Sequence, residues 1–381
     1  MNLAEATSPS QKMARIDGVD LLRGLAILLV LLNHVNIRLV LAHVPYASGL
    51  PRQLVDSLFW SGQSGVQMFF AISGFLITAT TIRRWGSVSR VSVRGFYVMR
   101  FARIAPLLLL LLAVLSVLHT AGLEDFVVKS KTGGLARALF AALTFHVNVL
   151  EARRGYLPGN WDVLWSLSVE EMFYLFFPLV ARLLGRGKFM IVLLFGFVAL
   201  GPYARAVLAN GNEVWHEYSY LGSMDAIAMG CLTALLATRV QFSRRGLWTS
   251  GSLGAGLLVF TLGFSLQTAQ WGLDRSGLTF TILAIGTCML VAVSAQTQWK
   301  SPWVLGPIRE MGQRSYEVYL THMFVVFALF NLFVRYGKPM KAVPVLFVAV
   351  IAIAGLFGAV VARLFSEPMN RYLRARWADW H

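Results

Sequence analysis

Long runs of apolar residues dominate this sequence and leave few folds open to it. Three of them cover residues 104–122, 189–208 and 343–365. A helix of about 20 apolar residues crosses the ~30 Å hydrocarbon core of a bilayer. The composition agrees, since 57% of the residues are hydrophobic and 14% are charged, against about 25% charged in soluble domains. These features exclude a water-soluble globule and predict an all-α, polytopic membrane protein.

Ten of the apolar runs are long enough to cross a bilayer, which predicts about ten transmembrane helices. The stretch 135–150 is not counted, because Arg137 and His146 interrupt it and because a span there would invert the positive-inside pattern. The predicted spans lie near residues 21–42, 59–80, 104–123, 164–181, 189–208, 220–238, 247–268, 278–298, 316–334 and 343–364.

The distribution of basic residues sets the predicted orientation of these spans. With ten spans, 22 of the 34 Lys and Arg residues fall on one side, which the positive-inside rule assigns to the cytoplasm. Both termini are then cytoplasmic, with tails at 1–20 and 365–381. The chain 1–381 is predicted to be a single membrane domain without repeats or an appended soluble domain, so its chemistry is expected inside that domain.

The formal net charge of +16 indicates anionic partners. Because the basic residues lie between spans and not on one face, we expect the membrane surface or a phosphorylated ligand, and no nucleic acid. The longest predicted connection, 124–163, lies outside and is suited to cover an external substrate. Cys231 and Cys288 fall inside apolar runs, so neither a disulfide framework nor a metal site is expected.

Ionisable side chains inside predicted spans are candidates for function, because a charge is costly in hydrocarbon. His34 follows Arg23 by eleven residues, which places both on one face of a helix, about 16 Å apart along its axis. A neutral histidine can act as a general base, or it can hydrogen-bond to a neighbouring helix for packing. The full set is Arg23, His34, Arg38, Glu170, Glu171, Asp225, Glu317 and His322.

Arg100 and Arg103 form a candidate anion site. They stand three residues apart just before Pro106, which is predicted to lie in the first turn of the following helix. Two guanidinium groups beside a helix N-terminus are well suited to phosphates. Ordinary positive-inside flanking is the alternative interpretation.

A first polar stripe runs along the fourth predicted span. Ser166, Glu170 and Tyr174 are spaced by four and share a face, whereas Glu171 points about 100° away from Glu170. One glutamate is therefore expected to face a cavity and the other to pair with an arginine. The alternative is a buried ion pair that only holds helices together.

A second polar stripe lies on the ninth predicted span. Ser315, Tyr319 and His322 share a face at positions i, i+4 and i+7, beginning at the predicted cytoplasmic end. This pattern fits a second catalytic or binding histidine, and it fits a hydrogen-bonded helix contact equally well.

Six short motifs follow one another almost from end to end of the chain. They are Asp20–Ala26 with His34, Phe69–Leu76, Arg100–Pro106, Trp165–Glu171 with Phe173 and Tyr174, Ser315–Tyr316 with Tyr319, Leu320 and His322, and Glu367–Pro368. In this order they resemble the acyltransferase-3 family of integral membrane acyltransferases. Gln67 departs from the pattern, since relatives often carry an acidic residue there, and we assign it no function.

The resemblance implies an acyl-CoA-dependent O-acyltransferase of the cell inner membrane, most often an O-acetyltransferase. Such an enzyme moves an acyl group from cytoplasmic acetyl-CoA or another acyl-CoA, without a metal, to a hydroxyl of an extracytoplasmic carbohydrate or glycolipid. Some relatives carry a fused extracytoplasmic hydrolase-like domain, which is not expected here. The expected roles are catalysis for His34, Glu170 and His322, donor binding for Arg23, Arg100 and Arg103, and substrate binding for Ser166, Tyr174 and Tyr319.

A proton-coupled secondary transporter is the alternative function. Intramembrane histidine and glutamate also serve as proton or substrate sites in transporters. The sequence shows no inverted repeat and no matching pair of broken helices, which are the patterns typical of that class. A non-catalytic scaffold would leave the polar stripes unexplained.

The orientation predicts the result of reporter fusions. Because the basic loops are assigned to the cytoplasm, fusions after Trp85, Gly187, Arg245 and Arg309 should all give a cytoplasmic signal. An external signal after Gly187 would contradict the topology, since it would mean that the stretch 135–150 crosses the membrane.

Overall fold

The computed structural model describes residues 15–297 and 299–378, and every regular element in them is helical. Ten helices are long and apolar enough to cross a membrane, which confirms the predicted all-α, polytopic fold. The main helices of these spans are α1 (Asp17–Leu41), α3 (Gly62–Trp85), α4 (Val93–Thr120), α8 (Leu164–Leu184), α9 (Phe189–Tyr203), α11 (Tyr220–Ala237), α12 (Arg244–Gly263), α14 (Leu278–Thr297), α16 (Ser315–Arg335) and α17 (Val343–Val361).

Shorter helices form most of the connections. The stretch 135–150 consists of two of them, α5 and the start of α6, and α6 packs against α8 and α10. Neither is long enough to cross a bilayer, as the sequence predicted. The shorter helices are α2 (Arg52–Phe59), α5 (Gly134–Leu143), α6 (Val147–Arg154), α7 (Gly159–Asp162), α10 (Glu213–Tyr218), α13 (Ser265–Gln270), α15 (Gly306–Gln313) and α18 (Glu367–Ala378).

Helix boundaries differ from the prediction at three places. Helix α4 begins at Val93 and not near 104, because the Ser92 side chain caps it by accepting a hydrogen bond from the Gly95 amide (3.1 Å). Helix α1 already begins at Asp17, within the predicted tail 1–20. The predicted tail 365–381 is largely helical, since α18 packs against α4. Parts of the predicted segments lie outside the described residues. They are residues 1–14 and 379–381 of the two tails and residue 298 of the eighth span.

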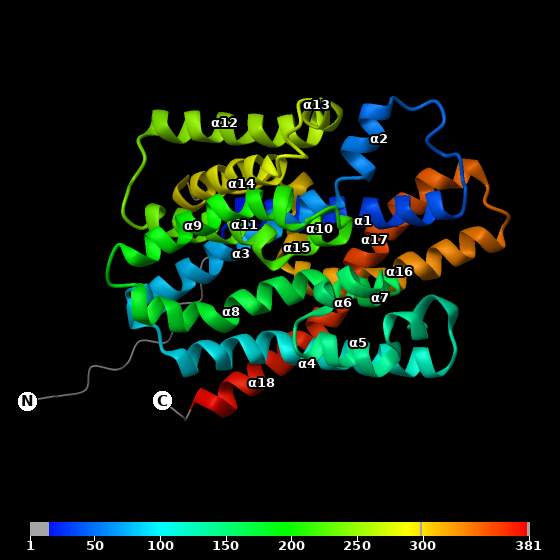
Figure 1. Cartoon of the computed structure of the whole chain (residues 1–381), viewed down its shortest axis with the longest axis horizontal. Helices are drawn as coiled ribbons and strands as arrows, with labels where there is room; N and C mark the ends of the chain where they lie inside the picture. Colours follow the sequence, from blue (N-terminus) through cyan, green and yellow to red (C-terminus); the bar gives the residue numbers. More distant parts are fainter. Residues whose placement is uncertain (1–14, 298, 379–381) are drawn as a thin grey trace, which may run out of the picture.

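The helices form one elongated bundle (Figure 1). Helix α3 packs against both α1 and α11, while α12 packs on α14 and α17 on α16. Two glycines bring the central helices together, because a Cβ on Gly65 would meet the Ala26 carbonyl of α1 and one on Gly74 would meet the Ile227 carbonyl of α11. Small residues at these positions therefore allow the helices to approach closely.

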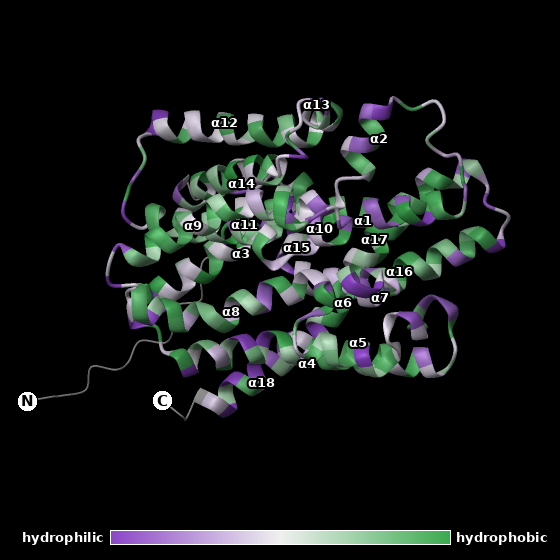
Figure 2. Cartoon of the chain, in the orientation of Figure 1, coloured by the Kyte–Doolittle hydropathy of each residue, from purple (hydrophilic) through white to green (hydrophobic). Residues whose placement is uncertain are grey.

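Polarity follows the long axis of the bundle. Figure 2 shows mostly hydrophobic helices along their lengths, with hydrophilic residues in the connections and in the first half of α4. The connections α3–α4, α8–α9 and α11–α12 lie at one end, on the left of Figure 1, and α5, α6 and α7 lie toward the other. The first of these ends carries the basic loops that we assigned to the cytoplasm.

A buried ion pair ties α9, α11 and α14 together. Arg205, in a π-helical turn (Ala204–Leu208) that follows α9, donates to both carboxylate oxygens of Asp225 at 2.7 and 3.0 Å. Its remaining N–H groups reach the Gly222 and Gly277 carbonyls and the Thr281 hydroxyl. The sequence singled out Asp225 as an ionisable residue inside a span, whereas Arg205 was overlooked because it stands alone near the end of an apolar run.

The Asp225→Asn variant should lose much of its stability. The substitution keeps the shape but leaves the Arg205 charge buried without a counterion, and breaking such a pair typically costs about 3–5 kcal/mol. The measurement is the thermal unfolding of purified protein in detergent. The matched control is Asp56→Asn, which removes an exposed pair with Arg52 and should cost less than about 1 kcal/mol. Equal melting of the two variants would contradict this assignment.

Candidate active site

Two histidines from distant parts of the chain meet in the interior of the bundle. The rings of His34 on α1 and His322 on α16 lie 5.0 Å apart between centroids, at an angle of 45°. His322 is fully buried, whereas His34 is half-buried. The fold thus joins two residues that the sequence could only place on separate helices.

The hydrogen bond of His322 fixes its tautomer. Its Nδ1 lies 2.6 Å from the Tyr319 carbonyl oxygen, and because a carbonyl only accepts, Nδ1 carries the proton. In the neutral ring Nε2 then has a free lone pair, and this atom has no hydrogen-bond partner in the described part of the chain. His322 therefore presents a proton-accepting nitrogen in the interior, beside His34.

Helices α1 and α16 contact each other again at Arg23. The Nε of Arg23 donates to the Ser315 hydroxyl at 3.1 Å. Since Arg23 precedes His34 and Ser315 precedes His322, the two helices run in the same direction. Their polar faces pack against each other. The predicted stripes on α1 and α16 thus form one continuous polar interface.

Arg100 lies inside a helix and is neutralised by α8. Its Nη2 pairs with Glu171 at 3.1 Å, and its guanidinium group stacks on the Tyr174 ring at 3.6 Å from the centroid. The predicted position beside a helix N-terminus is wrong, because α4 begins at Val93 and Pro106 lies within it. Glu171 is the glutamate that pairs with an arginine, as the stripe on α8 predicted.

Arg103 makes the corresponding pair with α16. Its Nη1 lies 3.2 Å from the carboxylate of Glu317, which is 1% exposed, while the arginine side chain is 29% exposed. The guanidinium also lies over the Tyr316 ring, 5.4 Å from its centroid. Arg103 of α4 is therefore a partly accessible cation that contacts the first turn of α16, the helix that carries His322.

Glu170 belongs to a hydrogen-bonded group with residues of α3 and α8. It accepts from the Tyr174 hydroxyl at 2.5 Å and from the Ser73 hydroxyl, which also contacts Tyr174. Tyr174 connects this group to Arg100. Glu170 and Tyr174 thus lie with the arginines, and not beside the histidines where an acceptor was expected.

Ser166 and Tyr319 lie beside the histidines instead. Their hydroxyl groups are hydrogen-bonded at 2.7 Å, and Tyr319 also contacts the His322 ring, with 5.7 Å between centroids. These two hydroxyl groups come from the predicted stripes on α8 and α16. They are the polar side chains best placed to meet a hydroxyl-bearing molecule near His322.

The connection 124–163 packs onto α1 and α16 just beyond the histidines. Asp125 accepts hydrogen bonds from Arg38 at 2.6 Å and from Asn331 at 2.7 Å. The Phe126 ring stacks on Phe324, and a Cβ on Gly159 would meet the Met323 side chain. The connection therefore covers the face of α16 that follows His322, in the position expected for a lid.

The sequence interpretation missed two polar residues near this site and left a third without a partner. Ser73 appeared only within the motif Phe69–Leu76, where its hydroxyl stands between an apolar residue and a glycine. Glu317 was noticed without a partner, which Arg103 supplies. Glu151, inside the connection, is fully buried, and burial, followed by the nearby Asp162, raises its pKa well above the ordinary value.

The fold and the site define a polytopic membrane protein with a charged, histidine-containing interior. Residues 16–364 match the family model of the acyltransferase-3 family, described as an acyltransferase domain. The chain belongs to this family, which confirms the resemblance that its six motifs predicted.

Relatives of known name are O-acetyltransferases of Staphylococcus aureus. "Putative O-acetyltransferase SACOL0978" of strain COL is 25% identical over 86% of this chain and 53% of its own length. "O-acetyltransferase OatA" of strain NCTC 8325 is 21% identical over 93% of this chain and 57% of its own length. This chain therefore spans about half the length of the curated relatives that it matches. No solved structure matches the chain.

Proposed function

We propose that this protein is a membrane O-acetyltransferase that moves an acyl group from cytoplasmic acyl-CoA to a hydroxyl of an extracytoplasmic carbohydrate or glycolipid. The observation that carries the proposal is the contact between His34 and His322. Arg23 of α1 bonds to Ser315, and Arg103 of α4 pairs with Glu317, both near the start of the helix that carries His322. Membership of the family and the names of the relatives support the acyl transfer. We place the protein in the cell inner membrane with both termini in the cytoplasm.

Arg23 and Arg103 are the proposed donor-binding residues, with Arg100 as a supporting cation. Arg103 is partly exposed, and its pair with Glu317 leaves donor groups of the guanidinium free for a phosphate. Arg100 is already paired with Glu171 and stacked on Tyr174. Its proposed contribution is therefore to hold these two side chains in place beside the donor site. The acyl end of the donor would then extend along α1 toward His34, about 16 Å from Arg23 along the helix.

His34 acts as the general base in the proposed reaction. It accepts the proton of the acceptor hydroxyl while the hydroxyl oxygen bonds to the thioester carbonyl carbon. The carbon–sulfur bond then breaks, and the CoA thiolate accepts that proton from His34 and leaves as a thiol. His322 carries its proton on Nδ1 and offers a lone pair on Nε2, so it can receive a hydrogen bond from a protonated His34.

The acceptor is proposed to enter from the outer end, beneath the connection 124–163. Ser166 and Tyr319 lie beside His322 and can hydrogen-bond to sugar hydroxyl groups. Glu170 and Tyr174 support the reaction by holding Arg100. With the donor on one side and the acceptor on the other, the acyl group crosses the membrane while CoA stays in the cytoplasm.

Replacing His34 tests the proposal. His34→Ala and His34→Gln should each lower donor turnover by roughly 10²–10⁴-fold, because a general base contributes about this much. Turnover is the release of CoA thiol from acetyl-CoA per folded molecule in detergent, with CoA affinity measured in parallel and expected to be unchanged. The matched control, His43→Gln, changes an exposed histidine of the loop after α1 and should stay active.

Two results would contradict this function. A fully active His34→Gln variant would remove His34 from catalysis and leave it a packing role. A folded wild-type protein that releases no thiol, with or without cell-surface glycans as acceptor, would favour the transporter.

Donor binding gives a separate prediction at Arg103. Arg103→Ala should weaken CoA binding by about tenfold or more, because a hydrogen bond to a charged group is lost. Arg103→Lys should restore only part of the affinity, since the bidentate fork is missing. Calorimetric titration of the purified protein with CoA measures both, with Arg90→Ala, in the exposed part of the α3–α4 loop, as control. Unchanged affinity in folded Arg103→Ala protein would leave this arginine with a topological role only.

A further inference from the structure

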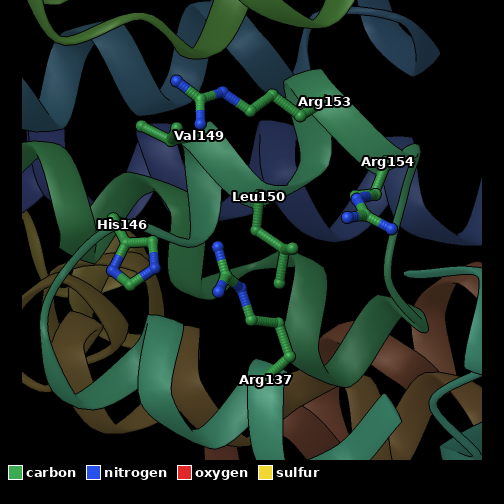
Figure 3. A pocket seen from close by; sticks show the side chains of 6 residues that line it. All are labelled: Arg137, His146, Val149, Leu150, Arg153 and Arg154. Atoms are coloured by element: carbon green, nitrogen blue, oxygen red, sulfur yellow. The ribbon is translucent and has the colours of Figure 1, made fainter. Parts of the chain in front are cut away.

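A second basic site lies in the outer connection, between α5 and α6. A cavity of about 130 Å³ opens there, well above the ~10–15 Å³ that one water requires. Figure 3 shows the Arg137 side chain reaching up toward Leu150 and His146, with Arg153 and Arg154 extending from the opposite helix. This arginine cavity is lined by Arg137, His146, Val149, Leu150, Arg153 and Arg154.

No carboxylate neutralises the arginine cavity. Arg137, Arg153 and Arg154 are exposed, and none of the ion pairs within 4.0 Å that join the described residues involves them. Burial lowers the pKa of His146, and the nearby positive charges of Arg137 and Arg153 lower it further. His146 is therefore neutral at pH 7, and the three arginines supply the positive charge of the cavity.

The position of these arginines is not explained by membrane topology. The connection lies at the end of the bundle opposite the basic α3–α4 loop (Figure 1), and the positive-inside rule disfavours a basic cluster on that side. Their clustering around one concavity, without acidic partners, is instead the pattern of an anion-binding site. Planar guanidinium groups bind phosphate oxygens in a bidentate manner.

The helix beside the cavity indicates what kind of anion it binds. Helix α5 is apolar but too short to cross a bilayer, and its Phe140 and Leu143 side chains are 56% and 49% exposed. Phe140 also packs edge-on against His146 in the cavity wall, with 5.3 Å between ring centroids. Exposed apolar side chains on a helix too short to span a bilayer are typical of segments at the membrane interface, which is the level of lipid phosphate groups.

We propose that the arginine cavity binds the phosphate group of a membrane amphiphile, whose hydrocarbon chains lie along the exposed face of α5. The phosphate oxygens contact Arg137 from one side and Arg153 and Arg154 from the other, which ties α5 to α6. The Val147 amide donates to the Ser168 hydroxyl on α8 at 3.2 Å. A bound lipid would thereby stabilise the packing of the connection 124–163 on α8. This inference goes beyond the proposed acyl transfer and does not depend on it.

Lipid binding by the purified full-length protein tests the inference. The probes are dioctanoyl phosphatidylglycerol and dioctanoylglycerol, which share their chains and differ in the phosphate-bearing headgroup, with binding followed by native mass spectrometry in nonionic detergent. The phosphate lipid should bind at least about tenfold more tightly, as expected for hydrogen bonds to a charged group. The Arg137→Gln/Arg153→Gln variant should lose this preference, whereas the corresponding Lys variant should keep part of it.

The matched control is Arg275→Gln/Arg335→Gln, which removes two exposed charges, one in the connection between α13 and α14 and one at the end of α16, and should bind like the wild type. Equal loss in the control and cavity variants would overturn the site, because it would show attraction to net charge alone. Displacement of the lipid by inorganic phosphate at the lipid's own dissociation constant would overturn the lipid assignment. The variants change exposed side chains without protein partners, so they should melt like the wild type, and thiol release reports the proposed enzyme activity separately.

Discussion

A charge inside hydrocarbon needs a partner, and the helices of this protein are arranged around that requirement. Glu171 pairs with Arg100, Glu317 with Arg103 and Asp225 with Arg205, each across two different helices. The paired residues stand 71, 214 and 20 positions apart in sequence. Each pair therefore brings together segments that local structure alone would leave independent, and an unpaired member would be costly.

Helix α4 is the element that links this charge pairing to the candidate active site. Arg100 and Arg103 of this helix hold α8 through Glu171 and α16 through Glu317. Helix α16 then meets α1 on a shared polar face, where Arg23 reaches Ser315 and His34 reaches His322. The histidines are thus positioned by ion pairs at one end of the bundle and by the lid contacts of Asp125 and Phe126 at the other.

The mistaken predictions have physical reasons. The start of α4 was placed eleven residues late because its arginines looked like those of a loop. In the structure Arg100 and Arg103 lie on helical turns and pair with residues of other helices. Arg205 was overlooked because it occurs singly in an apolar run. Ser73 received no role of its own, because nothing in its segment shows that Glu170 comes to lie opposite it.

The sequence by itself determined the ten spans and the helical class, because hydrocarbon thickness and the cost of buried charge act on each segment separately. The family was indicated by the resemblance of its six motifs. The sequence also placed Arg23 with His34, and Ser315 with His322, since the helix repeat fixes which residues share a face. Only the tertiary structure decided which faces meet, that His34 lies against His322, and that Glu170 and Tyr174 lie with Arg100. Which helix faces meet depends on packing between helices that are far apart in the chain. A local sequence pattern carries no information about that packing.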